Sequence, residues 1–167
     1  LRHTICEGVY FDSDMVNAFP TILLNICEYH NMECKWLKKY IDNREPWLRR
    51  LVHNHECTTD EAKKLIIALM NGKRYIQWSK GYRNGELDPD TVAFEEEMKS
   101  ILVVLIQFNP ELFNTVTKQK QYNKEGTFVS FYLQTIERRL LEHTYLFFVD
   151  KGIIENNRCV LAWDGIM

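Results

Sequence analysis

The sequence is poor in features that mark several large classes of protein. Glycine (7 residues) and proline (4 residues) are scarce, and there is no low-complexity segment or internal repeat. No apolar run approaches the roughly 18 residues that span a membrane, and no basic-then-apolar leader is present. With 167 residues, 46% of them hydrophobic, we expect one intracellular globular domain with a substantial core. We expect it to be an excised or processed core and not a whole product.

Cysteine usage argues against a disulfide-stabilised fold. The five cysteines are an odd number and form no CxxC pair, which indicates reduced thiols that mostly fill the core. The segment His53-Asn54-His55-Glu56-Cys57 resembles half of a zinc site. Because no CxxC or HxxxH partner accompanies it, we do not expect zinc there.

The chain also lacks the overall positive charge that is typical of nucleic-acid-binding proteins. Its formal net charge is −2 at pH 7, but the charge is unevenly distributed. From Lys35 to Gly85, twelve lysines and arginines accompany five acids, a local charge of +7 that leaves −9 for the rest of the chain. A basic middle between acidic flanks favours a phosphate-contacting lobe, although a solvated helical surface has the same composition.

Hydrophobic periodicity predicts a strand, a mostly helical middle and a final hairpin, which together indicate an α+β fold. Thr58 with Glu61 forms a capping box at the start of one helix, and Asn71-Gly72 is a typical end for it. We expect a strand over 5–16 and a hairpin over 152–162. Between them we expect helices that begin at Pro20 and that cover 33–52, 62–70, 90–108 and 126–149. The helix over 33–52 should be interrupted near Pro46.

Two segments place a carboxylate at the end of an apolar run, where a rigid backbone can present it to a metal ion. Asp14 lies where the first strand turns into a helix, and Asp12 shares its face of that strand. Asp164 follows four apolar or small residues and precedes Gly165, which permits close approach of another chain. The alternatives are that Asp12 or Asp14 caps a helix or lies at an edge, and that Asp164-Gly165 is only a hairpin turn.

Between these carboxylates lies an amphipathic helix that begins with paired lysines. Lys63 and Lys64 carry compact charges suited to β- and γ-phosphates. The helix dipole disfavours lysine in a first turn, so the pair indicates either a phosphate site or simple solvent exposure. Asn71-Gly72, two helical turns beyond Lys63, would face the same ligand, although it can equally be a C-terminal cap.

Three motifs carry a resemblance to the transposon–virus polymerase family, the distant relatives of family A DNA polymerases and phage-type single-subunit RNA polymerases. Motif A is Asp14-x-x-Asn17-Ala18-Phe19-Pro20, motif B is Lys63–Gly72, and motif C is Ala162-Trp163-Asp164-Gly165. The segment Gly126–Glu137, with Gln134, resembles the helix before motif C. Three positions depart from the pattern: Trp163 replaces a histidine, Asn71 an aromatic residue, and Thr59 the arginine of family A.

This resemblance implies a small antiparallel palm sheet with a predominantly helical, fingers-like insertion. It also implies a single palm and fingers core over residues 1–167. Motif A would belong to a palm part over 1–32, and motif B to a basic fingers-like segment over 33–85. Helices over 86–167 would return the chain to the palm with motif C.

The implied activity is DNA-polymerase-like nucleotidyl transfer from nucleoside triphosphates to a 3′-hydroxyl. Asp14 and Asp164, with Asp12 as a further ligand, would hold two Mg²⁺ or Mn²⁺ ions, and Lys63 would neutralise charge on the leaving pyrophosphate. The residues implied to bind the nucleotide are Lys63, Lys64, Phe19, Asn71 and Gly72, with Phe19 as the candidate that excludes ribose. The residues implied to contact nucleic acid are Lys73, Arg74, Gln134 and Trp163.

The same resemblance suggests partners and leaves two alternatives open. Template–primer DNA is the expected partner, and a helicase ATPase is expected as a companion or fused domain. We expect no membrane association. The expected location is a viral replication site, or the host cytoplasm or nucleus.

One alternative is a metal-dependent glycosyltransferase, because Phe11-Asp12-Ser13-Asp14 resembles a DxD site. That interpretation leaves Asp164 and motif B unexplained. The other is a catalytically retired palm domain that serves as an interaction module, in which Asp14 and Asp164 would not converge.

Overall fold

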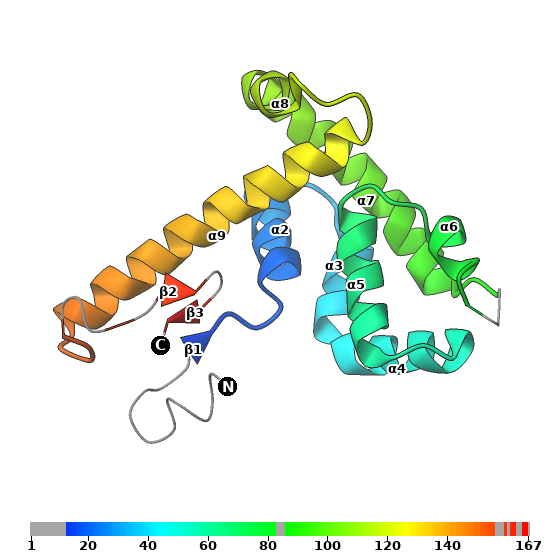
Figure 1. The fold of residues 1–167 in the computed structure, drawn as a ribbon, viewed down its shortest axis with the longest axis horizontal. Helices are drawn as coiled ribbons and strands as arrows, with labels where there is room; N and C mark the ends of the chain where they lie inside the picture. Colours follow the sequence, from blue (N-terminus) through cyan, green and yellow to red (C-terminus); the bar gives the residue numbers. More distant parts are fainter. Residues whose placement is uncertain (1–12, 83–85, 156–158, 160, 163–164, 167) are drawn as a thin grey trace.

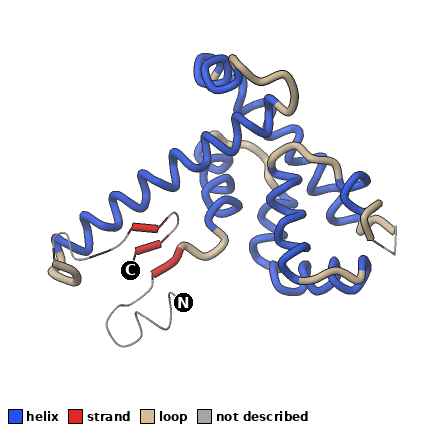
Figure 2. Tube along the Cα trace, viewed as in Figure 1, coloured by secondary structure: helices blue, strands red, loops and turns tan. Residues whose placement is uncertain are grey.

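Helices dominate the computed structural model, which describes residues 13–82, 86–155, 159, 161–162 and 165–166. The helices are α2 (Ala18–Tyr29), α3 (Lys35–Asp42), α4 (Arg44–His55), α5 (Thr59–Met70), α6 (Tyr75–Ser79), α7 (Pro89–Phe108), α8 (Pro110–Thr117) and α9 (Lys124–Asp150). The strands are β1 (Ser13–Asp14), β2 (Leu161–Ala162) and β3 (Gly165–Ile166). Figures 1 and 2 show α3 to α7 gathered on one side, with one long helix, α9, running diagonally from beside α8 to the strands.

The expected α+β fold with a palm sheet is wrong, because nearly all regular structure in the described residues is helical. The three strands are two residues long and form an antiparallel ladder in the order β1-β3-β2. So short a ladder cannot form a layer that buries a helix face. The helices therefore pack on one another, and the buried core residues belong almost entirely to them.

The first strand of the hairpin predicted over 152–162 is wrong, although Leu161 and Ala162 at its end do form strand β2, and residues 156–158 and 160 lie outside the described part. Gly152 has a φ of 66° and follows the last turn of α9, where the Ile153 N–H donates to the carbonyl of Phe148 at 2.9 Å. This arrangement is a glycine-based helix end, so the residues after it complete α9 instead of starting a strand. The pairing that does occur joins Leu161 to Ile166 and Ala162 to Gly165.

Local sequence signals at the start of α5 and around α7 are confirmed. Thr58 and Glu61 form the predicted capping box, and α5 ends at Met70 with Asn71 as its C-cap. Helix α7 begins at Pro89, behind the Asp88 side chain that accepts from the Thr91 N–H at 2.9 Å. Pro fits the first turn because its missing N–H has no helical partner there.

The interruption expected near Pro46 occurs three residues earlier. Helix α3 ends at Asp42 and α4 begins at Arg44, with Asn43 between them. Pro46 lies in the first turn of α4, where a proline is tolerated. The break at Asn43 therefore places the start of α4, and with it Arg44, beside the end of α3.

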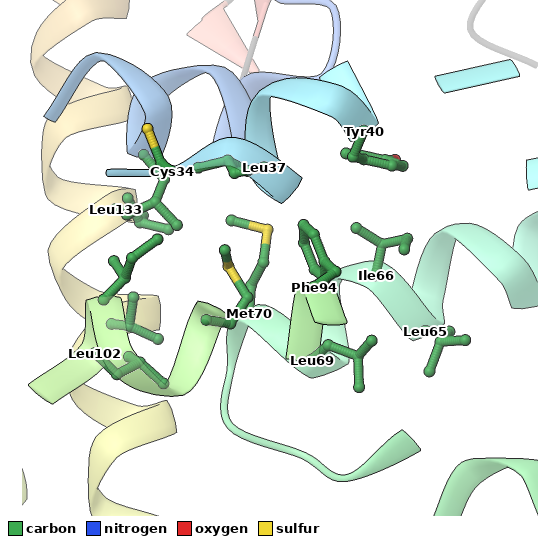
Figure 3. Packing of buried hydrophobic residues seen from close by; sticks show 14 of the residues in the cluster. Cys34, Leu37, Tyr40, Leu65, Ile66, Leu69, Met70, Phe94, Leu102 and Leu133 are labelled. Atoms are coloured by element: carbon green, nitrogen blue, oxygen red, sulfur yellow. The ribbon is translucent and has the colours of Figure 1, made fainter. Parts of the chain in front are cut away.

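One hydrophobic core runs from α2 through α3, α4, α5 and α7 to α9. Figure 3 shows Leu37 and Tyr40 of α3 facing residues of α5 and Phe94 of α7, with Leu133 of α9 closing one side. The Trp47 indole N–H, which is buried in this core, donates to the Thr91 hydroxyl at 2.9 Å. Burial of apolar side chains at this density is the main stabilising contribution to the fold.

Helix α9 connects the two ends of the described chain. It contacts α2, α7, α8 and β3. Figure 1 shows the strand ladder beside the C-terminal half of α9, next to the loop that leads into α2. Within the described ranges, we find no helix with the length and hydropathy needed to cross a membrane.

Candidate functional site

A pocket of about 310 Å³ brings together two of the three sequence motifs. Its lining combines the start of α2, the junction of α3 with α4, one side of α5 and the middle of α9. The lining residues are Met15, Asn17, Ala18, Phe19, Pro20, Tyr40, Arg44, Lys63, Ile67 and Glu137. Motif A thus contributes Asn17 to Pro20, and motif B contributes Lys63 and Ile67.

The turn between β1 and α2 positions motif A at this pocket. Asn17 has a φ of 55°, a left-handed conformation that asparagine adopts more readily than most residues. This turn redirects the chain from β1 into α2, so that the first turn of α2 borders the pocket. Asn17 makes no side-chain cap, and Asn43 likewise makes none for α4. Two helix N-termini, each with a partial positive charge, therefore lie at the pocket wall.

Lys63 is the predicted site residue that supplies full positive charge here. It lies in the first turns of α5, is exposed, and pairs with Asp60 Oδ1 at 3.4 Å. Such a surface pair contributes little to stability and is readily exchanged for another anion. Its neighbour Lys64 is exposed but does not line the pocket, because adjacent helical residues point in different directions.

Arg44 is a second cation at the pocket, and the sequence reasoning did not single it out. It is the first residue of α4, and its Nη1 donates to Glu45 Oε1 at 2.6 Å. Its Nε is buried and has no hydrogen-bond acceptor among the residues the structure describes. Leaving a buried donor unsatisfied costs about 1–3 kcal/mol. In the sequence, the only indication of Arg44 as a site residue was the excess of basic residues over 35–85. The sequence could not single it out, because whether Arg44 lies near Lys63 depends on how α4 packs on α5.

Tyr40 and Glu137 complete the polar lining. Burial is the main cause that raises the pKa of Tyr40, and the nearby Arg44 guanidinium partly opposes it. The phenol therefore stays neutral at physiological pH. Glu137 on α9 is 8% exposed and is the one acid among the lining residues. The pocket thus carries two cationic side chains and one carboxylate.

The strand ladder brings the ends of motifs A and C together. Asp14 pairs with Gly165, the residue that follows Asp164 in the chain. Asp12, Trp163, Asp164 and the side chain of Asp14 lie outside the described part of the structure. Among the side chains it describes, no group of three His, Cys, Asp or Glu residues is placed to hold a metal ion.

Asn71 and Gly72 do not line the pocket that contains Lys63. They follow α5 at its opposite end, about 12 Å along the helix by the rise of 1.5 Å per residue. The Asn71 carbonyl lies against Gly126 at the start of α9, and Gly72 is near Leu102 of α7. The structure therefore places this end of motif B between α7 and α9.

The other residues expected to contact nucleic acid are exposed. Lys73 and Arg74 follow α5, and Arg74 is the N-cap of α6. Gln134 on α9 lines a second cavity of about 690 Å³. Glu137 borders both cavities, which links the Gln134 face of α9 to the pocket with Lys63.

A third, apolar groove of about 660 Å³ runs between α2 and α9 and includes Tyr29 and Leu140.

His55, from the segment that resembles half of a zinc site, is buried in an aromatic cluster. Its Nε2 shares a hydrogen bond with the Tyr75 hydroxyl. Its ring also meets those of Trp78 and Tyr82 edge-on. The same Tyr75 hydroxyl accepts from the Asp88 N–H at 3.2 Å. This histidine therefore ties α4 to α6 and to the start of α7.

Comparisons with known proteins connect the chain to one viral protein. No protein-family description matches the sequence, and no solved structure matches it. Over 171 aligned residues that cover all of this chain, it is 28% identical to "Putative helicase V13" of Sputnik virophage. The chain spans 22% of the length of that protein. The chain is thus similar to one part of a larger viral protein whose name refers to a helicase.

Proposed function

We propose that the chain is the core of a template-directed nucleotidyltransferase that binds a nucleoside triphosphate in the pocket with Lys63. The observation that carries the proposal is the meeting of Phe19 from motif A and Lys63 from motif B at one pocket. These residues are far apart in the sequence, so their proximity is independent of the motif match. The pairing of Asp14 with Gly165 further supports it, because it joins motifs A and C.

The pocket lining suits the charge of a triphosphate. Lys63 and the N-termini of α2 and α4 supply positive potential, and phosphate oxygens accept readily from lysine and from backbone N–H groups. In the proposed reaction, the primer 3′-hydroxyl oxygen bonds to the α-phosphorus while the bond to the bridging oxygen breaks. Pyrophosphate leaves, and the hydroxyl proton passes to solvent. Lys63 would stabilise the charge that develops on the leaving group.

Divalent cations fit the donor chemistry at the strand ladder. Carboxylate oxygens are the ligands that Mg²⁺ prefers, and Asp14 lies opposite the residue next to Asp164. Asp14 and Asp164 would hold the ions, with Asp12 as a further ligand. When bound, Mg²⁺ lowers the pKa of the 3′-hydroxyl and offsets phosphate charge. Phe19 lines the same pocket, and in this proposal it would contact the sugar of the incoming nucleotide.

The name of the virophage protein fits an association with helicase activity. Within these 167 residues there is no Gly-x₄-Gly-Lys-Ser/Thr sequence, the loop that binds ATP phosphates in P-loop helicases. We therefore assign the helicase association to a partner or a fused segment rather than to this chain. Template–primer DNA would be contacted by the exposed Lys73, Arg74 and Gln134.

Primer extension tests the proposal directly. We expect the wild-type chain to extend a DNA hairpin primer with Mg²⁺ or Mn²⁺, and Asp14→Ala and Asp164→Ala each to reduce the rate by a hundredfold or more, since each removes a metal ligand. Asp150→Ala is the matched control, because Asp150 is an exposed carboxylate at the end of α9. Wild-type chain that binds DNA but never extends the primer, or extension that survives both substitutions, would contradict the proposal.

A further inference from the structure

Arg44 stands out among the polar side chains because its environment is incomplete. It lines the pocket with Lys63, yet its Nε is buried without an acceptor in the described structure. Its guanidinium can donate five hydrogen bonds in a planar fork. The neighbouring carboxylate of Glu45 accepts one of them, at Nη1, and the Tyr40 side chain also interacts with the guanidinium.

The Glu45 contact leaves the guanidinium available to a stronger partner. Glu45 is the next residue in the chain, and its side chain is 63% exposed. An exposed pair of this kind is weak because water and salt compete with it. Phosphate oxygens can accept two parallel hydrogen bonds from the fork and form the shorter, charge-assisted kind.

The fold also holds Arg44 in place before any ligand arrives. Its position at the start of α4 is fixed by the buried Trp47 one turn later, which donates to Thr91 of α7. Tyr40, which is buried at the end of α3, lies beside the guanidinium and lines the same pocket. A guanidinium that is ordered in advance loses less conformational freedom when it binds a ligand.

We propose that Arg44 is a second triphosphate-binding residue, which acts with Lys63 at the same pocket. This inference rests on the proposed nucleotidyltransferase function, and it names a residue that lies outside all three motifs. Thr59, one helical turn before Lys63, supplies no charge to this pocket. In this chain the second cation comes from α4 instead of from α5.

Calorimetric binding of inorganic tripolyphosphate and of dATP, dADP and dAMP to the 167-residue chain tests the inference. We expect Arg44→Gln and Lys63→Gln each to weaken tripolyphosphate and dATP binding about tenfold, as loss of a charge-assisted hydrogen bond predicts. dAMP binding should change little. Arg44→Lys should recover part of the loss, because lysine keeps the charge but not the fork. Arg49→Gln, an exposed arginine on α4, is the matched control and should bind as the wild type does.

The outcomes separate this inference from the proposed function. If the wild-type chain extends primers and Arg44→Gln keeps the wild-type KM for dATP, the inference is overturned while the function stands. If tripolyphosphate binding depends on Arg44 but no primer is extended, the phosphate site stands and the polymerase function fails. Circular dichroism and thermal unfolding of each variant, with Arg44→Lys as the milder change, show whether a loss reflects misfolding.

Discussion

Gly126, in the first turn of α9, determines how that helix meets the end of α5. A Cβ atom at this position would lie 2.2 Å from the Asn71 carbonyl oxygen and 2.6 Å from the Asn123 side chain. The nearest atom belongs to the backbone, so it cannot rotate away as a flexible side chain could. The absence of a side chain therefore lets α9 lie against the segment that ends motif B.

Substitution of this glycine tests the contact. Inside a helix, replacing glycine with alanine usually stabilises the folded state by about 1 kcal/mol. At Gly126 the clash with the Asn71 carbonyl should make the same substitution destabilising. We expect Gly126→Ala to lower the free energy of unfolding by about 1–3 kcal/mol, the usual range for overpacking. Urea denaturation measures the change, with Gly81→Ala as the control because a Cβ there meets only ordinary contacts. A Gly126→Ala chain as stable as the wild type would refute the close approach.

Helix α5 shows what can be inferred from local sequence. Thr58 and Glu61 predict its start, and Asn71-Gly72 its end, because caps are set by residues only a few positions apart. The same local reasoning failed at Gly152-Ile153-Ile154, where β-branched residues suggested a strand but complete the end of α9. Helices α6 and α8 were missed because both are short and depend on tertiary packing.

The capping box gives a prediction at this helix. Thr58→Ala should destabilise the chain by about 1 kcal/mol, because the Glu61 N–H loses its acceptor. Thermal unfolding measures this loss. The control is Thr115→Ala, the same substitution at an exposed threonine of α8 whose hydroxyl donates to the Glu111 carbonyl. If the two substitutions have equal effects, the box does not stabilise α5.

Glu61 also makes this stabilisation pH-dependent. Hydrogen bonds from the Thr58 backbone and then its hydroxyl lower the pKa of the Glu61 carboxyl below its ordinary value of 4.5. A lowered folded-state pKa means that the contribution is complete above the unfolded pKa and is lost as the pH falls through the folded one. The stability difference between wild type and Glu61→Gln should therefore shrink below about pH 4.5. A difference that stays constant down to pH 3 would contradict this assignment.

At the scale of the whole molecule, the fold class expected from the sequence was wrong, and the functional roles expected for the three motifs stay predictions. Phe19 of motif A and Lys63 of motif B are far apart in the sequence, and both line the same pocket. The α+β class was wrong because the described residues are almost all helical and their ladder has two-residue strands. Most of the strand expected over 5–16 lies outside the described residues. Arg44 could not be predicted because its place in the pocket follows from α4 packing on α5, not from any spacing in the sequence.

The basic segment over 35–85, which spans α3 to α6, gives a prediction for DNA binding. Affinity for a primer–template should fall steeply with salt, because each neutralised phosphate contributes about −0.9 to the slope of log K against log salt. The double variant Lys73→Gln with Arg74→Gln should make this slope shallower by up to about 2. Fluorescence anisotropy between low and moderate salt measures it, with the exposed pair Lys118→Gln and Lys120→Gln as control. An unchanged slope in the first variant would exclude these two contacts.

The pairing of β1 with β3 has a consequence for the order in which the molecule assembles. Asp14 and Gly165 are 151 positions apart, so their contact closes almost the entire chain. Loop closure over such a distance is slow and entropically costly, whereas the helices form from local contacts. The helical body should therefore fold first, and the ladder should close last and open most readily. Amide hydrogens of the ladder should then exchange with solvent sooner than those of α5 and α7. Because the ladder opens independently of the helical body, a ligand that contacts both motif A and motif C could stabilise the ladder without reorganising the core.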